Sequence, residues 1–163
     1  MASILGIRID QIAQKEAIEK VAWFLDSQKQ NKIFTPNPEM LVDARKDEYF
    51  KEVLNSGDLN ICDGIGLVFA SFGRLKKIAG VDFMLDICRL AQEKGKSVYL
   101  LGSGDEDVVK RAAEALKIKF SGLKICGFNS GPKIRRLDDQ KISYNESGNE
   151  GLLYDIIMSA PDI

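Results

Sequence analysis

The chain has 163 residues, 45% of them hydrophobic and 29% charged, and its 23 basic side chains nearly balance its 24 acidic ones. This length and composition predict one globular domain over 1–163, which the alternating pattern below identifies as α/β, and the net charge of -1 argues against nucleic acid as a partner. Histidine is absent, which removes the commonest general base and the commonest metal ligand. No stretch approaches the roughly 20 apolar residues of a membrane span, and no signal-peptide pattern is present, so we expect a cytoplasmic protein.

The first half of the chain alternates apolar strand patterns with amphipathic helix patterns. Asn37 is a candidate N-cap for a helix that has Pro38 as its first residue. In chain order we expect a strand at 3–10, a helix over 13–28, a strand at 32–35, a helix from 38, a second helical segment around 50–54 and a strand at 59–62.

The second half continues this alternation. We expect a short helix in 66–73, a helix from about Asp82 to Gly95, a strand at 97–102, a helix within 103–117, a strand at 123–128, a mainly loop segment at 129–150 and a last helix after 150. Such alternation predicts a Rossmann-like sandwich with a mainly parallel sheet flanked by helices. At Ile163 the pattern calls for a further strand.

Three loops follow predicted strands, and in a parallel sheet they would share the edge where ligands bind. These loops contain Thr35, Asn37, Asp63, Gly102, Ser103 and Gly104. Three roles are open for Asp63: a helix cap, a salt-bridge partner or a catalytic base. The adjacent Gly64 and Gly66 favour the base, because glycines let a substrate lie against the main chain.

The other candidates keep two interpretations each. Thr35 and Asn37 are either turn residues or ligands of a substrate. The turn from Gly102 to Gly104 either holds a phosphate on backbone amides or is a tight turn before a helix capped by Asp105, and it matches neither GxGxxG nor a P-loop. The three cysteines lie far apart in apolar runs, which favours reduced core thiols, and we expect no metal site.

Three segments together resemble the WecG/TagA/CpsF glycosyltransferases, a bacterial family that includes the N-acetylmannosaminyltransferases of wall teichoic acid synthesis. The segments are FTPNPEMLVDARKDEYFKEVLNSGDLNICDGIGLVFAS (34–71), KIAGVDFMLDICRLAQEKGKSVYLLGSG (77–104) and LKICGF (123–128). The resemblance implies an inverting, metal-independent and cofactor-free enzyme. It would move N-acetylmannosamine or a related sugar from a UDP-sugar to undecaprenyl-diphosphate-linked N-acetylglucosamine.

The resemblance also assigns roles to residues. Asp63 matches the proposed general base, Thr35 and Asn37 match a pocket-lining turn, and the Gly102–Ser103–Gly104 loop matches the nucleotide site. Gly64 and Lys77 complete the expected substrate-binding set, and Lys77 stands where the family usually has Arg, so it keeps the charge but lacks the bidentate fork.

Family members continue beyond the position of Ile163 with further strands and a basic appendage that contacts the membrane. We therefore expect this chain to be the N-terminal portion of the catalytic domain, peripheral at the inner face of the membrane and prone to self-association at its open sheet edge. One alternative is a non-catalytic nucleotide-binding or assembly module. An NAD-dependent oxidoreductase is disfavoured, because no glycine-rich turn follows the first strand.

Overall fold

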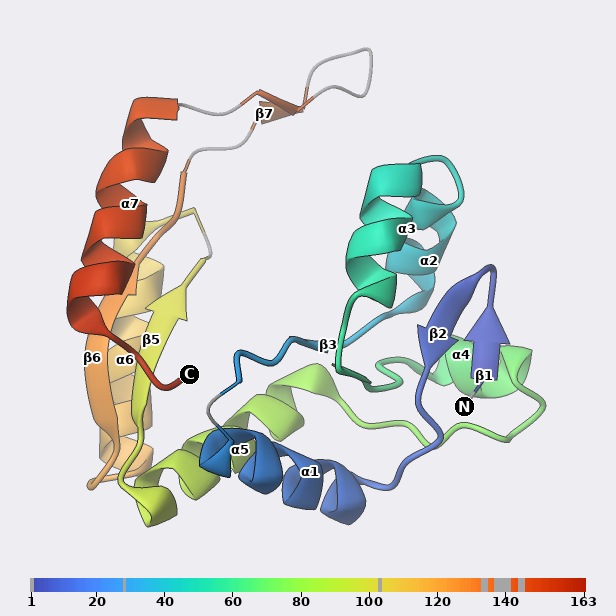
Figure 1. The fold of residues 1–163 in the computed structure, drawn as a ribbon, viewed down its shortest axis with the longest axis horizontal. Helices are drawn as coiled ribbons and strands as arrows, with labels where there is room; N and C mark the ends of the chain where they lie inside the picture. The colour runs from blue at the N-terminus through green and yellow to red at the C-terminus, as the bar shows by residue number, and fades with distance from the viewer. Residues whose placement is uncertain (1, 28, 103, 133–134, 137–141, 144–145) are drawn as a thin grey trace. The chain divides into compact units, whose positions relative to one another are not determined.

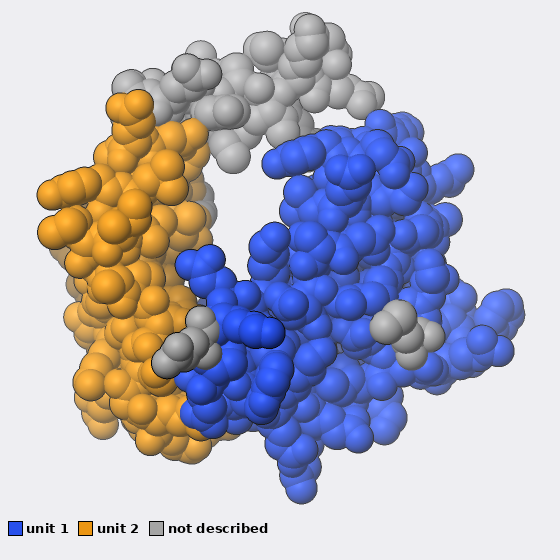
Figure 2. Space-filling model, viewed as in Figure 1, with its two compact units in different colours: residues 1–87 blue, residues 88–163 orange. Residues whose placement is uncertain are grey.

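The structure is a computed structural model that describes residues 2–27, 29–102, 104–132, 135–136, 142–143 and 146–163. The chain divides into two compact units, residues 1–87 and residues 88–163, which Figure 2 shows in different colours. Buried apolar side chains are present in both units.

The first unit contains paired short strands and the helices that connect them (Figure 1). Its elements are β1 (Ala2–Ile4), β2 (Ile7–Ile9), α1 (Gln14–Asp26), β3 (Ile33–Phe34), α2 (Pro38–Ala44), α3 (Glu48–Asn55), β4 (Leu59–Asn60) and α4 (Ile65–Ala70), and α5 (Gly80–Lys94) runs from this unit into the second. Strands β1 and β2 form an antiparallel hairpin. The prediction of one strand over 3–10 is therefore wrong, because Leu5 and Gly6 adopt positive φ angles of 52° and 81° and reverse the chain.

Strands β3 and β4 pair in parallel, as the alternation of strands and helices predicted. The ladder continues past both strands, because the amides of Ile61 and Asp63 donate to the carbonyls of Phe34 and Pro36 at 3.0 Å each. This pairing fixes the carboxyl ends of the two strands side by side.

The core of the first unit is apolar, with one buried amide at its centre. Its buried residues are Ile7, Ile9, Leu41, Ala44, Leu54, Cys62, Leu67 and Leu75. The fully buried Asn60 donates from Nδ2 to the carbonyls of Arg8 and Leu54 at 2.9 and 2.8 Å. These bonds tie β2 and the end of α3 to β4, so the side chain of Asn60 acts as a structural bracket.

The second unit is a βαβ arrangement with α6 and α7 packed against β6 (Figure 1). Its elements are β5 (Ser97–Leu101), α6 (Glu106–Lys119), β6 (Lys124–Asn129), β7 (Arg135–Arg136), β8 (Ile142–Ser143) and α7 (Glu146–Ser159). Strands β5 and β6 are parallel, whereas β7 and β8 form an antiparallel pair inside the segment predicted to be mainly loop.

The last residue pairs with β5 on the hydrogen-bonding pattern of a parallel strand. The amide of Ile163 donates to the carbonyl of Ser97 at 3.1 Å, and the amide of Tyr99 donates to the carbonyl of Ile163 at 2.8 Å. The chain thus begins to pair at the position where the alternation called for another strand. Short parallel sheets flanked by helices confirm the predicted Rossmann-like α/β class.

Candidate functional site

The side chains of Thr35 and Asp63 meet beside the first residue of α5. A Cβ atom built on Gly80 would lie 3.0 Å from Asp63 Oδ2 and 3.2 Å from Thr35 Oγ1. Both side chains follow strands of the β3–β4 ladder, and both are partly exposed to solvent. The ladder and α5 therefore bring together two candidates that lie 28 positions apart in the chain.

The Asp63 carboxylate has neither of the two structural roles considered for it. Helix α4 has Gly64 as its N-cap and no capping side chain. Among the residues that the structure describes, the carboxylate of Asp63 accepts no hydrogen bond and forms no ion pair. A partly exposed acid that holds nothing in place is free to act on a ligand.

Two electrostatic features surround this carboxylate. Burial, and secondarily the charge of Asp63, raise the pKa of the Cys62 thiol, which keeps that neighbour neutral. The carboxylate also lies near the N-terminus of α5, a 15-residue helix whose first backbone amides carry partial positive charge. Asp63 is thus next to a neutral thiol and a positive helix end.

Thr35 and Asn37 differ in how far their side chains are already engaged. Asn37 Oδ1 accepts a hydrogen bond from the amide of Met40 at 2.9 Å, which confirms its predicted cap of α2. Within the described ranges, the Thr35 hydroxyl makes no hydrogen bond, and it lies beside Gly80. Thr35 is therefore the stronger candidate for a substrate contact.

The glycines after Asp63 make room for a proline. A Cβ on either Gly64 or Gly66 would lie 3.0 Å from the ring of Pro38, and Gly64 has a φ of 128°. These glycines therefore allow the N-terminus of α4 to pack against the N-terminus of α2. This packing role is an explanation for the two glycines that does not involve a substrate. A shallow depression of about 420 Å³ lies on the α2 side of that ring, lined by Pro38, Glu39, Val42 and Asp43.

Lys77 lies on an exposed stretch that runs beside the end of β4. The next residue, Ile78, is buried and donates its amide to the carbonyl of Cys62 at 2.9 Å. Lys77 itself is exposed, so its ammonium group is accessible to an anion. The pairing of Ile78 fixes the backbone of Lys77 near the end of the strand that leads to Asp63.

The Gly102–Gly104 loop belongs to the second unit, and its two described amides are already used. Gly102 donates to the carbonyl of Asn129 and Gly104 to that of Ser130, each at 3.0 Å. Asp105 caps α6 by accepting from the amides of Asp107 and Val108, as predicted. A phosphate held here would have to replace these bonds, and Ser103 lies outside the described residues. The loop's nucleotide-binding role stays a prediction.

Gly80 is the site residue that sequence reasoning passed over. It stands in the segment KIAGVD (77–82), which was noted for Lys77 alone. A glycine two residues before the predicted helix start at Asp82 was the available signal. Its missing side chain is what allows Asp63 and Thr35 to approach the start of α5.

Comparison with known proteins adds an independent observation to this geometry. The model of the glycosyl transferase WecG/TagA/CpsF family matches residues 2–163. The chain belongs to this family. The match covers both units and every candidate residue named above, so the sequence resemblance is confirmed.

Two similar proteins share the name N-acetylglucosaminyldiphosphoundecaprenol N-acetyl-beta-D-mannosaminyltransferase. The protein from Bacillus spizizenii is 33% identical over 112 residues, which cover 66% of this chain and 43% of that protein. The protein from Staphylococcus aureus (strain NCTC 8325 / PS 47) is 31% identical over 127 residues, covering 74% of this chain and 49% of that protein. The chain spans about half the length of the curated relatives it matches.

Two further features concern the described residues of this WecG/TagA/CpsF family member. No group of three or more cysteine or acidic side chains in those residues is arranged to hold a metal ion. None of the described helices combines the length and apolar character needed to cross a bilayer.

Proposed function

We propose that this chain carries the sugar-transfer site of a glycosyltransferase. The donor would be UDP-N-acetylmannosamine or a related UDP-sugar, and the acceptor undecaprenyl-diphosphate-linked N-acetylglucosamine, in the synthesis of teichoic acid or another surface polysaccharide. The names of the relatives support the transferred sugar and the acceptor. The observation that carries the proposal is the partly exposed Asp63 carboxylate, unpartnered in the described structure and close, like the Thr35 hydroxyl, to Gly80.

In the proposed reaction, Asp63 is the general base. Its carboxylate takes the proton from the attacking hydroxyl of the acceptor sugar, and the hydroxyl oxygen forms a bond to the anomeric carbon of the donor. The bond from that carbon to the diphosphate oxygen breaks, and UDP leaves with the bonding electron pair. One such displacement inverts the configuration at the anomeric carbon. We propose that Thr35 hydrogen-bonds a sugar in this position, because its hydroxyl lies on the same side of Gly80 as the Asp63 carboxylate.

The leaving diphosphate needs positive charge, which this chain can supply without a metal ion. Lys77 is exposed next to the strand end, and Gly80, the first residue of α5, lies beside the Asp63 carboxylate, so the partial positive charge of that helix end is close to it. We therefore propose that transfer does not require a divalent cation. Equal rates with magnesium and with a chelator would support this, and a strict magnesium requirement would contradict it.

The site assignment is tested by Asp63→Asn, which keeps the shape of the side chain and removes its basicity. We expect the rate of UDP release in the presence of acceptor to fall by about 10²–10⁴-fold, the usual contribution of a general base. Asp43→Asn, an exposed carboxylate on α2 in the same unit, is the matched control and should keep the wild-type rate. Unchanged turnover in Asp63→Asn would refute the role of Asp63.

Calorimetry with UDP separates the proposal from its alternative. Asp63→Asn should bind UDP as the unsubstituted chain does, because the base acts on the acceptor. Binding of UDP with no turnover in the unsubstituted chain would favour a nucleotide-binding or assembly module. Binding of NAD in place of UDP would favour an oxidoreductase.

A further inference from the structure

Helix α4 and the turn after it carry an apolar stripe on their outer side. Ile65, Phe69 and Phe72 follow each other at spacings of four and three, so they lie on one side of the helical path. Their side chains are 56%, 74% and 92% exposed, whereas Leu67 and Leu75, on the other side, are 2% and 1% exposed. The segment is therefore apolar on both sides, although only one side is buried in the core.

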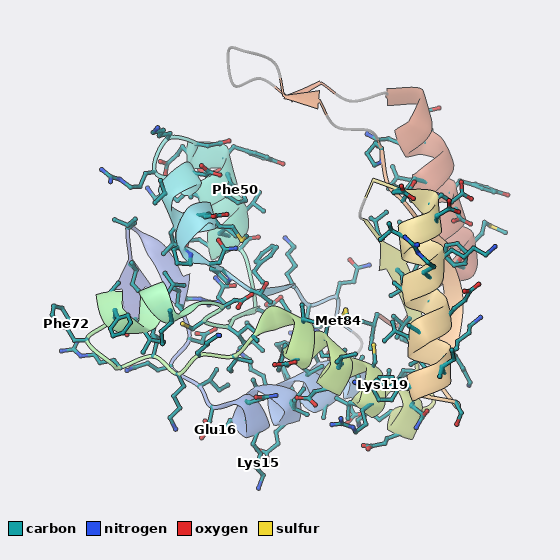
Figure 3. The ribbon with its side chains drawn as sticks, turned by 180° about the vertical axis from the view of Figure 1, so that it is seen from behind. Lys15, Glu16, Phe50, Phe72, Met84 and Lys119 are labelled. Atoms are coloured by element: carbon teal, nitrogen blue, oxygen red, sulfur yellow. The ribbon has the colours of Figure 1, made fainter. Side chains whose placement is uncertain are left out.

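Phe72 is held at the tip of this segment in an unfavourable conformation. Its φ of 54° lies in the left-handed region, which costs a bulky residue energy, and Gly73 follows with a φ of 75°. Figure 3 shows the ring directed away from the ribbon. An aromatic side chain that is strained and yet 92% exposed gains no packing within the described structure. Strain without a packing benefit points to a function of the exposed ring.

The charged residues within the α4 segment and the turn after it all have one sign. From Gly64 to Val81 the chain contains three basic residues, Arg74, Lys76 and Lys77, and no acidic residue. All three basic side chains are exposed. An exposed aromatic ring followed by cations is complementary to an anionic bilayer, in which charged headgroups lie above an apolar interior.

We propose that this α4 surface, formed by Ile65, Phe69, Phe72, Arg74 and Lys76, docks on an anionic lipid bilayer. Phe72 would enter the headgroup boundary, while Arg74 and Lys76 pair with lipid phosphates. A second copy of the chain fits this surface less well, because a symmetric contact would place like charges against one another. Helix α4 begins two residues after Asp63, so docking would bring the base close to the bilayer. This step alone rests on the proposed function, in which the acceptor is a lipid.

The proposal is tested by co-sedimentation of the full chain with vesicles of phosphatidylcholine, with and without phosphatidylglycerol. We expect binding to the vesicles that contain phosphatidylglycerol and little binding to phosphatidylcholine alone. Phe72→Asn should reduce the partition coefficient by about tenfold or more, because a buried aromatic ring is lost. Asparagine tolerates the left-handed region, so this variant should fold at least as stably as the original chain.

Two further variants separate the contributions. Lys76→Glu should weaken binding to anionic vesicles at least about fivefold, the factor expected for one basic residue near an anionic surface. Trp23→Ser on α1 removes another exposed aromatic, 62% exposed, and should leave vesicle binding unchanged. Circular dichroism of each variant checks that the helices are retained.

Three outcomes would overturn the proposal. The first is no binding to either vesicle type, and the second is binding by Phe72→Asn equal to that of the unsubstituted chain. The third is self-association in sedimentation equilibrium that Phe72→Asn abolishes, because the surface would then be a contact between copies of the chain. Asp63→Asn keeps these results distinct from a failure of the proposed function. That variant should lose transfer and bind vesicles normally.

Discussion

Gly80, the first residue of α5, leaves no room for a side chain at the candidate site. We therefore predict the effect of Gly80→Ala, which adds a single methyl group. In the present backbone this methyl would lie 3.0 Å from Asp63 Oδ2 and 3.2 Å from Thr35 Oγ1. Carbon and oxygen atoms rarely approach so closely, so the two side chains would have to move by a few tenths of an ångström. The substitution thus displaces the proposed base and its neighbour while leaving both residues in the chain.

The expected effect on stability is small because two contributions oppose each other. Gly80 does not have a positive φ, so alanine fits the backbone, and replacing glycine in a helix stabilises by up to about 1 kcal/mol. Overpacking against Asp63 and Thr35 costs about 1–3 kcal/mol. The free energy of unfolding should therefore change by no more than about 2 kcal/mol. A misplacement of about 1 Å costs about 10²-fold in rate. The smaller displacement expected here should therefore lower the transfer rate by about tenfold or more.

The assay combines urea unfolding with measurement of UDP release from the donor in the presence of the lipid-linked acceptor. Gly151→Ala is the matched control, because Gly151 lies in helix α7 with no atom within 4 Å of the added methyl. This control should gain up to about 1 kcal/mol of stability and keep its transfer rate. The comparison isolates the crowding at Gly80 from the general effect of alanine in a helix.

Full activity in Gly80→Ala would refute the placement of Asp63 and Thr35 as a site that depends on their distance from α5. A loss of activity accompanied by a stability loss well above about 3 kcal/mol would also count against it, since unfolding would then explain the result. Gly80→Val enlarges the side chain further. It should lower the transfer rate more than alanine does.

Three further predictions concern other parts of the fold. Asn60→Ala should lower the free energy of unfolding by about 2–4 kcal/mol in urea titrations, because two buried carbonyls lose their donor; a change below about 1 kcal/mol would contradict its bracketing role. Hydrogen bonds from Ser97 and Lys96 lower the pKa of Asp162 to about 2, so its contribution is present above the ordinary 3.8 and is lost as pH falls toward 2. In Asp162→Asn, the free energy of unfolding should therefore no longer decrease between about pH 3.8 and 2 on account of this group. The effect should be less than about 1 kcal/mol, since the carboxylate is exposed. Burial and a hydrogen bond to Asp155 raise the pKa of Tyr99 to about 12. An ultraviolet titration should therefore show one tyrosine that ionises at about this pH, and the Tyr99→Phe variant should lack this ionisation.

The sequence determined most local elements of this protein, the β1–β2 hairpin and the β7–β8 pair excepted, because these elements depend on short-range chemistry. Apolar periodicity and glycine or proline stops were enough to predict the helices and the parallel strands. The caps at Asn37 and Asp105 follow from side chains that bond to amides two or three residues later. Asp63 could be singled out for the same reason, since a strand end and an adjacent glycine turn are visible in the chain itself.

The tertiary structure decided which of these local features serve a ligand. Gly64 and Gly66 pack against Pro38, and the amides of Gly102 and Gly104 are satisfied by carbonyls that lie 26 or 27 positions away. Gly80 brings its helix against two side chains from separate strands. These contacts join residues distant in the chain, so no local pattern can report them. Only the packed fold shows whether a glycine accommodates a neighbouring ring, a helix end or a substrate.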